Sequence, residues 1–225
     1  MCRSCPLIIV GLAACVALGS AAAGDRKAQT IDGWGTVVDP DGDCRVRQDK
    51  GKLTITVPKT YHDLTYQEDR FKLNAPRVLQ PAKGDFQLQV EVATFPIPDA
   101  DTSSSGAATF VSSGLLVWAD EKNFIRMERA ATGGGSAPFI WVELFQDGKS
   151  VTHKAQDIED KPTHLRVSRS GDKLTFETSP DGKDWTEVHS AELKLPEKIQ
   201  VGVLAINTTT REFSAQLQGL KAGPR

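Results

Sequence analysis

Apolar and polar residues alternate with a period of two through most of the chain, and this pattern limits it to a β-rich fold. The segments 52–57, 86–93, 173–178 and 212–218 each place aliphatic or aromatic side chains at every second position, with polar residues between them. A strand with this pattern has one face on a core and the other in water. Beyond residue 23, no stretch keeps a helical period over three turns, so we expect an all-β fold.

Dipeptides typical of tight turns separate the expected strands. They are Asp41-Gly42, Lys50-Gly51, Asp147-Gly148, Gly171-Asp172 and Asp181-Gly182. Many short strands with close turns and no crossover helices predict an antiparallel sandwich or barrel. The Pro-, Asp- and Ser-rich stretch 96–106 and the glycine-rich stretch 132–136 are followed directly by further strand patterns, which is typical of loops. We therefore expect one domain over residues 30–222.

The first 23 residues have the pattern of a cleaved secretory signal peptide. Arg3 precedes an apolar run, Leu7–Leu18, and small residues follow at Ala21–Ala23. Such a run is too short to stay in a bilayer as a transmembrane helix. An alternative is a bacterial lipobox at Leu12–Cys15, with cleavage before Cys15 and a lipid anchor on that cysteine. Both predict an extracytoplasmic protein, secreted or periplasmic in the first case and a lipoprotein in the second.

Charge and cysteine content exclude several classes of protein. The formal net charge is −2 with 25% charged residues, so we expect neither nucleic-acid binding nor a polybasic membrane anchor. Without the leader, Cys44 is the one remaining cysteine, and an intramolecular disulfide is excluded. A domain of this length buries enough surface to fold without one.

Three expected strands, 115–118, 124–128 and 139–145, carry the candidate functional residues. If they are neighbours, one outer face presents Trp118, Arg126, Glu128, Trp141 and Glu143. Aromatic rings beside carboxylate and guanidinium groups suit sugars, because pyranose C–H faces stack on indoles and hydroxyls take charge-assisted hydrogen bonds. The alternative is that the charged residues form ordinary pairs and a loop covers the tryptophans.

The run Ser113–Arg129 resembles the hallmark segment of the bacterial "domain of unknown function 1349" family. Further similar pieces are Gly33–Gly35, Ala75–Leu79, Gly84–Phe86, Ser179–Trp185 and Val201–Val203. The family belongs to the concanavalin A-like lectin and glucanase superfamily and also resembles the accessory domain of some β-xylosidases. The resemblance implies a jelly-roll sandwich of two antiparallel sheets, one of them concave. It implies little about activity, because fold alone does not confer function.

The segment Asp39-Pro40-Asp41-Gly42-Asp43 is the candidate metal site. Asp39, Asp41 and Asp43 place carboxylates at alternating positions, as calcium ligands often stand. The EF-hand pattern fails, since Lys50 occupies its twelfth position. The alternative is a turn whose Asp side chains cap backbone amides. The superfamily resemblance also implies a structural calcium in some members.

The sequence favours binding over catalysis. Glu128 and Glu143 are candidate acid and base, with His62 and Asp63 as outside candidates at a sheet rim. Glycoside hydrolysis needs two carboxylates that flank the bond, but the Glu-x-Asp string usual in glucanases of this superfamily is absent. We expect a non-catalytic, lectin-like domain that binds a polysaccharide or glycan through a concave face, with His62 added to the five face residues. The alternatives are a glycoside hydrolase and a structural or protein-interaction domain of the cell envelope.

Overall fold

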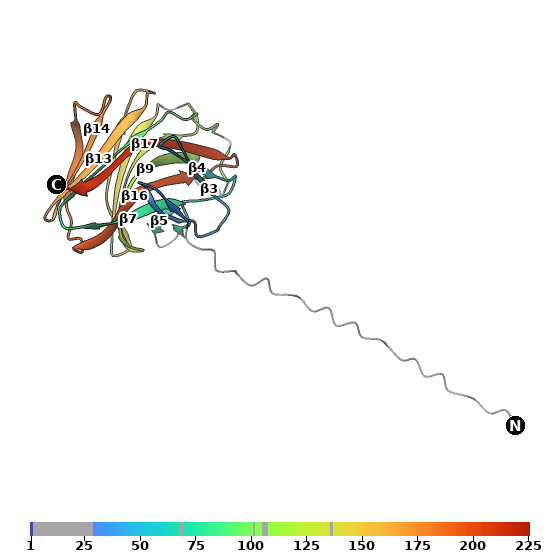
Figure 1. Cartoon of the computed structure of the whole chain (residues 1–225). Coiled ribbons are helices and arrows are strands. Elements are labelled where there is room, and N and C mark those ends of the chain that lie inside the picture. The colour runs from blue at the N-terminus through green and yellow to red at the C-terminus, as the bar shows by residue number, and fades with distance from the viewer. Residues whose placement is uncertain (2–28, 68–69, 101, 105–107, 136) are drawn as a thin grey trace.

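The computed structural model describes Met1 and residues 29–225, apart from 68–69, 101, 105–107 and 136. The described residues form strands, turns and loops without a helix. Two large antiparallel sheets face each other as a jelly-roll sandwich (Figure 1), which confirms the predicted fold class. The expected signal segment, including Cys15, lies almost entirely outside the described residues. Among the residues that the structure does describe, none belongs to a helix long and apolar enough to span a membrane.

The first sheet has eight strands. Their spatial order is β1 (Thr30–Ile31), β2 (Gly35–Val38), β7 (Arg77–Lys83), β16 (Lys198–Asn207), β9 (Phe110–Asp120), β10 (Asn123–Thr132), β11 (Phe139–Gln146) and β12 (Lys149–Asp157). The strands β9, β10 and β11 are hydrogen-bonded neighbours, as the candidate face requires.

The second sheet has seven strands and covers the inner face of the first. Their order is β15 (Thr186–Glu192), β14 (Lys173–Ser179), β13 (Thr163–Ser170), β8 (Phe86–Val92), β17 (Phe213–Pro224), β4 (Lys52–Val57) and β3 (Arg45–Asp49). One continuous apolar core lies between the two sheets. In β8 and at the start of β17 buried residues alternate strictly with more exposed ones, as the period-two pattern predicts.

Three of the predicted turn dipeptides close two-residue hairpins, and Gly171-Asp172 does so between β13 and β14. Lys50-Gly51 joins β3 to β4 and Asp147-Gly148 joins β11 to β12, and all four residues have positive φ. This is the type I′ geometry, whose twist matches that of antiparallel strands. The Asp147-Gly148 turn fixes the register that places the side chains of β11.

A short separate hairpin lies over part of the outer face of the first sheet. It consists of β5 (Leu64–Gln67) and β6 (Arg70–Leu73). Its Leu64 belongs to a second buried apolar cluster with residues of the sheet's outer face. The members of that cluster are Leu64, Ala75, Leu79, Leu116, Phe124, Phe145, Leu204 and Ile206. The hairpin thereby divides the outer face into a covered part and an accessible part.

Candidate functional site

A pocket of about 370 Å³ opens on the accessible part of this outer face. Three sources supply its walls: the strands β9 to β11, the segment before the β5–β6 hairpin, and the end of β16. The lining residues are Tyr61, Asp63, Ala108, Phe110, Arg126, Thr132, Phe139, Trp141 and Thr208. Four aromatic side chains and one ion pair thus surround a space within the size range of small-molecule sites, about 300–1,000 Å³.

Arg126 of β10 is the charged centre of the pocket. Its side chain is buried and lies among three carboxylates. Its Nη2 is 2.5 Å from Glu143 Oε2, and its Nη1 is 3.3 Å from Asp63 Oδ1. The third carboxylate, Glu128 Oε2, lies 3.7 Å from Nε. Burial lowers the pKa of Arg126, but these carboxylates more than offset it, so the pKa is raised and the guanidinium stays charged.

Glu143 holds Arg126 and Trp141 in place from β11. Its Oε2 also accepts a hydrogen bond from Trp141 Nε1 at 3.0 Å, and Ser150 donates to its Oε1 at 2.8 Å. Burial raises the pKa of Glu143, but the Arg126 charge and these hydrogen bonds outweigh it and hold the pKa below its ordinary value. Glu143 is therefore an ionised, fully engaged carboxylate.

Trp141 stands at the pocket with its indole ring clamped. One face of the ring stacks on His153 of β12, with centroids 5.6 Å apart and planes 17° apart. Phe139 meets it edge to face at 6.4 Å. The side chain is half-buried, so part of the ring is open to a ligand.

Glu128 lies beneath the pocket and does not line it. Ser112 donates to its Oε1 at 2.9 Å, while its Oε2 is buried without a hydrogen-bond partner. Burial raises the pKa of this carboxyl, the Arg126 charge and the Ser112 hydroxyl lower it in part, and the resulting pKa is about 7.

The strand register explains why these four residues meet. Arg126 lies directly opposite Glu143, and Glu128 lies opposite Trp141, in the β10–β11 ladder. Residues opposite each other on one face of an antiparallel pair have Cβ atoms about 5 Å apart. The sequence prediction that strands 124–128 and 139–145 share a charged and aromatic outer face therefore matches the observed pairing.

Trp118 lies elsewhere on the same face. It is opposite Phe124 in the β9–β10 ladder. Phe124 comes four residues before Glu128 on β10, which corresponds to about 13 Å along the strand. Its ring stacks on Phe124 at 5.3 Å, and the Arg77 guanidinium lies 4.6 Å from its centroid. Trp118 packs against the apolar cluster under the β5–β6 hairpin. This arrangement resembles the alternative expected from the sequence, in which a loop covers the tryptophans.

His62 also lies outside the pocket, although both of its neighbours line it. Its ring is 1% exposed and points away toward the loop that holds Asp41 and Asp43. Tyr61 and Asp63 face the pocket, where the Tyr61 hydroxyl donates to Asp63 Oδ2 at 2.9 Å. Sequence reasoning missed Tyr61 and Phe110 as lining residues, because neither lies in the three strands that carried the pattern.

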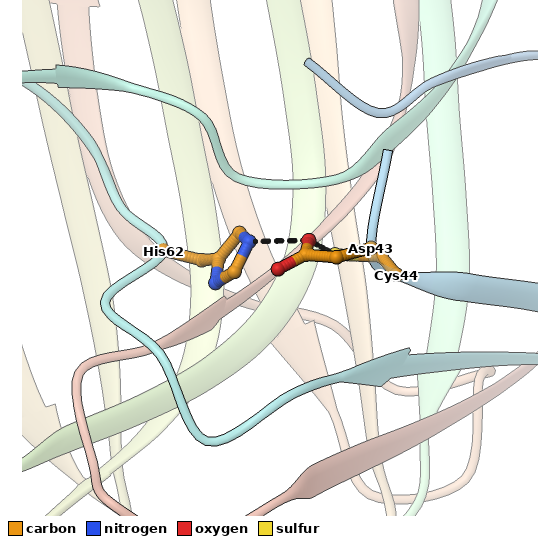
Figure 2. A group of neighbouring side chains, drawn as sticks. All are labelled: Asp43, Cys44 and His62. Carbon is orange, nitrogen blue, oxygen red and sulfur yellow. Dashed lines mark hydrogen bonds and ion pairs between the residues drawn. The ribbon is translucent and has the colours of Figure 1, made fainter. Parts of the chain in front are cut away.

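The loop Asp39–Asp43 lies directly beside His62 (Figure 2). Asp39 shapes this loop, since its two carboxylate oxygens accept hydrogen bonds from the backbone N–H groups of Gly42 and Cys44. Asp41 and Asp43 turn their carboxylates toward His62, at 3.5 and 3.0 Å from Nε2. Of the three expected metal ligands, one is therefore engaged by the backbone and two face a histidine.

The comparison with known families agrees with the sequence resemblance. Residues 43–224 match the family described as "protein of unknown function (DUF1349)". The match covers most of the chain, and the chain belongs to this family. A comparison with curated proteins gave no match.

Solved structures with this fold come from several organisms. A functionally unknown protein from Saccharomyces cerevisiae is similar with a TM-score of 0.70 and 17% identity, over 85% of this chain and 97% of that one. The GH43 protein BlXynB from Bacillus licheniformis has a TM-score of 0.62 and 14% identity, over 84% of this chain and 36% of that one. A legume lectin-like domain from Entamoeba histolytica has a TM-score of 0.52 and 10% identity, over 84% and 89%. At these identities the similarity establishes the fold alone.

Proposed function

We propose that the chain is a non-catalytic carbohydrate-binding domain and that the Arg126–Trp141 pocket is its binding site. The observation that carries the proposal is the composition of this pocket. Aromatic side chains from the two strands β9 and β11 and from the loop before β5 surround a buried, charged guanidinium. Sites for small polar ligands combine mostly apolar walls with a few fixed polar groups in this way.

Each part of a sugar has a counterpart among the lining residues. The C–H face of a pyranose ring would stack on the Trp141 indole, on the side opposite His153. Hydroxyl groups would bond to Arg126 and Asp63, whose charges make these hydrogen bonds stronger than neutral ones. The polar groups are held by Glu143 and Tyr61 before any ligand arrives, so little ordering cost would attend binding.

Glycoside hydrolysis is the second candidate, and Glu128 is the residue that favours it. A carboxyl with a pKa of about 7 has the property of a general acid. Glu128 is 0% exposed and does not line the pocket, and Glu143 is engaged by Arg126, Trp141 and Ser150. Neither carboxylate is placed to reach a glycosidic bond in the pocket, so we favour binding.

The distinguishing experiment incubates the purified protein with a panel of polysaccharides and records both retention and the release of reducing sugar. Retention without release supports the binding domain. Release that disappears in Glu128→Gln or Glu143→Gln would replace the proposal with the hydrolase. Neither retention nor release would overturn both and favour a structural or protein-interaction domain.

The proposed place of action is outside the cytoplasm, where polysaccharides are encountered. The leader pattern of residues 1–23 supports this, with a soluble product after cleavage at residue 23 or a lipid-anchored one after cleavage before Cys15. Mass spectrometry of the N-terminus of the exported protein distinguishes the two. An intact Met1 on protein from the cytoplasmic fraction would contradict both.

A further inference from the structure

A cluster of nitrogen, oxygen and sulfur donors lies beside the pocket. Asp43, Cys44 and His62 each bring a ligand atom to within 4.8 Å of the others (Figure 2). Asp41 Oδ2 is also within 3.5 Å of His62 Nε2. The donors come from two segments, the Asp39–Cys44 loop and the stretch before β5, so the chain fold itself assembles the set.

The surroundings of His62 fix which of its nitrogens faces the cluster. Its Nδ1 lies 3.1 Å from the Thr60 carbonyl oxygen and 3.3 Å from the Thr60 hydroxyl, so Thr60 occupies this nitrogen and Nε2 is the ring nitrogen that faces the cluster. This Nε2 lies 3.5 Å from Asp41 Oδ2 and 3.0 Å from Asp43 Oδ1, and in the tautomer that carries its proton on Nδ1 it offers a lone pair to a metal ion. An imidazole nitrogen and two carboxylates that converge in this way form the kind of donor set that binds a metal ion. Histidines that bind metals usually donate their other N–H to a carbonyl or carboxylate in this manner.

We propose that Asp41, Asp43, Cys44 and His62 form a binding site for zinc or a similar first-row transition metal. Tetrahedral zinc has bonds of about 2.0–2.3 Å, which places its ligand atoms about 3.3–3.7 Å apart. Here His62 Nε2 is 3.0 Å from Asp43 Oδ1 and 3.5 Å from Asp41 Oδ2, and Cys44 Sγ is 3.6 Å from Asp43 Oδ1. These three distances lie close to that range, and the side chains of Asp41 and Asp43 are about half exposed, which leaves them room to adjust around an ion.

The donor types select zinc over calcium. Calcium takes six to eight oxygen ligands, whereas this cluster offers one imidazole, one thiol and two carboxylates. Asp39, the third carboxylate of the loop, already accepts two backbone hydrogen bonds. Imidazole and thiolate are ligands typical of zinc. On binding, the metal replaces the proton of the Cys44 thiol, which passes to solvent.

The site would brace one wall of the pocket. His62 pairs through its backbone with Asn207 of β16, with N···O distances of 2.8 and 3.0 Å. Asn74 donates to Asp41 Oδ2 and to the Tyr61 carbonyl oxygen, at 2.7 and 2.9 Å. A metal at His62 would therefore tie the loop to the segment that presents Tyr61 and Asp63. The role is structural, and the metal site itself does not depend on what the pocket binds.

Cobalt and zinc binding to the purified full chain test the proposal. After treatment with chelator, zinc is expected to raise the thermal unfolding midpoint more than calcium does. Cobalt is expected to give a thiolate-to-cobalt charge-transfer band. Cys44→Ser abolishes this band, which assigns it to Cys44 and not to the leader cysteines. Asp43→Asn weakens zinc binding at least about tenfold, since loss of even a supporting residue costs 10–100-fold. Asp49→Asn, an exposed change outside the cluster, leaves it unchanged.

Two results would overturn the proposal. One is a cobalt band that persists in Cys44→Ser, together with zinc affinity unchanged in Asp43→Asn. The other is a midpoint that responds to calcium and not to zinc. Should Asp43→Asn fail to fold, the cobalt band in Cys44→Ser decides, because the thiol-to-hydroxyl change at this half-buried position is nearly isosteric. Polysaccharide retention is measured separately, so failure of the metal site and failure of the carbohydrate site give different results.

Discussion

Replacing Glu128 by Gln tests whether burial beneath the pocket raises the pKa of Glu128 as the structure indicates. Glu128 is fully buried, and its pKa is about 7 instead of the ordinary 4.5. The folded protein therefore holds this proton more tightly than the unfolded chain does. The stabilising effect is complete below pH 4.5 and is lost as the pH rises toward 7. At about 1.4 kcal/mol per pH unit, this change in pKa corresponds to about 3 kcal/mol.

The assay is chemical unfolding at a series of pH values between 5 and 8, followed by tryptophan fluorescence. The free energy of unfolding of the wild type is expected to fall relative to that of Glu128→Gln as the pH rises, by an amount approaching 3 kcal/mol. Ser112→Ala removes the hydrogen bond to Oε1, which favours the charged form, and should shift the fall to higher pH. The pKa of Glu143 is lowered from its ordinary value of 4.5, so its contribution to stability changes only at pH values below about 4.5. Glu143 therefore leaves the profile between pH 5 and 8 unaffected. Parallel profiles for wild type and Glu128→Gln would refute the reasoning.

Three further substitutions test the surrounding structure, each by chemical unfolding. Arg126→Met leaves buried carboxylates without a counter-ion and should cost about 3–5 kcal/mol; a loss below 1 kcal/mol would contradict the buried cluster. Trp118→Ala removes a ring stacked on Phe124 and should cost about 2–3 kcal/mol without changing polysaccharide retention; lost retention in a folded variant would place Trp118 in the site. Gly202→Ala drives a methyl group into the carbonyl group of a neighbouring strand and should lower the free energy of unfolding by about 1–3 kcal/mol. Its control is Gly223→Ala, where the added methyl group meets nothing within 4 Å and stability should not change. Equal stability of the two variants would contradict the close approach at Gly202.

The sequence predicts correctly those features that depend on a single strand or a single turn. Period two assigns Ile140, Val142 and Leu144 to one face of a strand and Trp141 and Glu143 to the other, and the structure agrees. A two-residue turn such as Asp147-Gly148 has few alternatives, so it could be recognised locally. The sandwich followed from the absence of helical periods, but strand order required the family resemblance.

The features that the sequence could not predict depend on the register between strands and on which segments cover the outer face of the sheet. Trp118 and Trp141 share a face, but the β9–β10–β11 register separates them, and the β5–β6 hairpin covers the cluster against which Trp118 packs. The contact of His62 with Asp43 joins segments 19 residues apart around an irregular loop, for which no periodicity gives a signal. Tyr61 was missed for the same reason.

The structure also changes one expectation about Trp141. From sequence alone, we expect Trp141→Ala to leave stability nearly unchanged. In the structure its Nε1–H donates to the ionised Glu143, and hydrogen bonds to charged groups contribute about 1.5–3 kcal/mol. Trp141→Ala is therefore expected to lower the free energy of unfolding by about 2 kcal/mol. The binding test can be interpreted only if the variant remains folded.

The measurement that tests the central claim most directly is the affinity of Trp141→Ala for the polysaccharide that the wild type retains best. Its matched control is Trp185→Ala, a half-buried tryptophan near the second sheet with the Arg166 guanidinium 3.9 Å from its ring centroid. Both variants are compared at a temperature where circular dichroism shows them folded. The account predicts that Trp141→Ala loses binding while Trp185→Ala retains it. Full binding by a folded Trp141→Ala would contradict the assignment of the pocket.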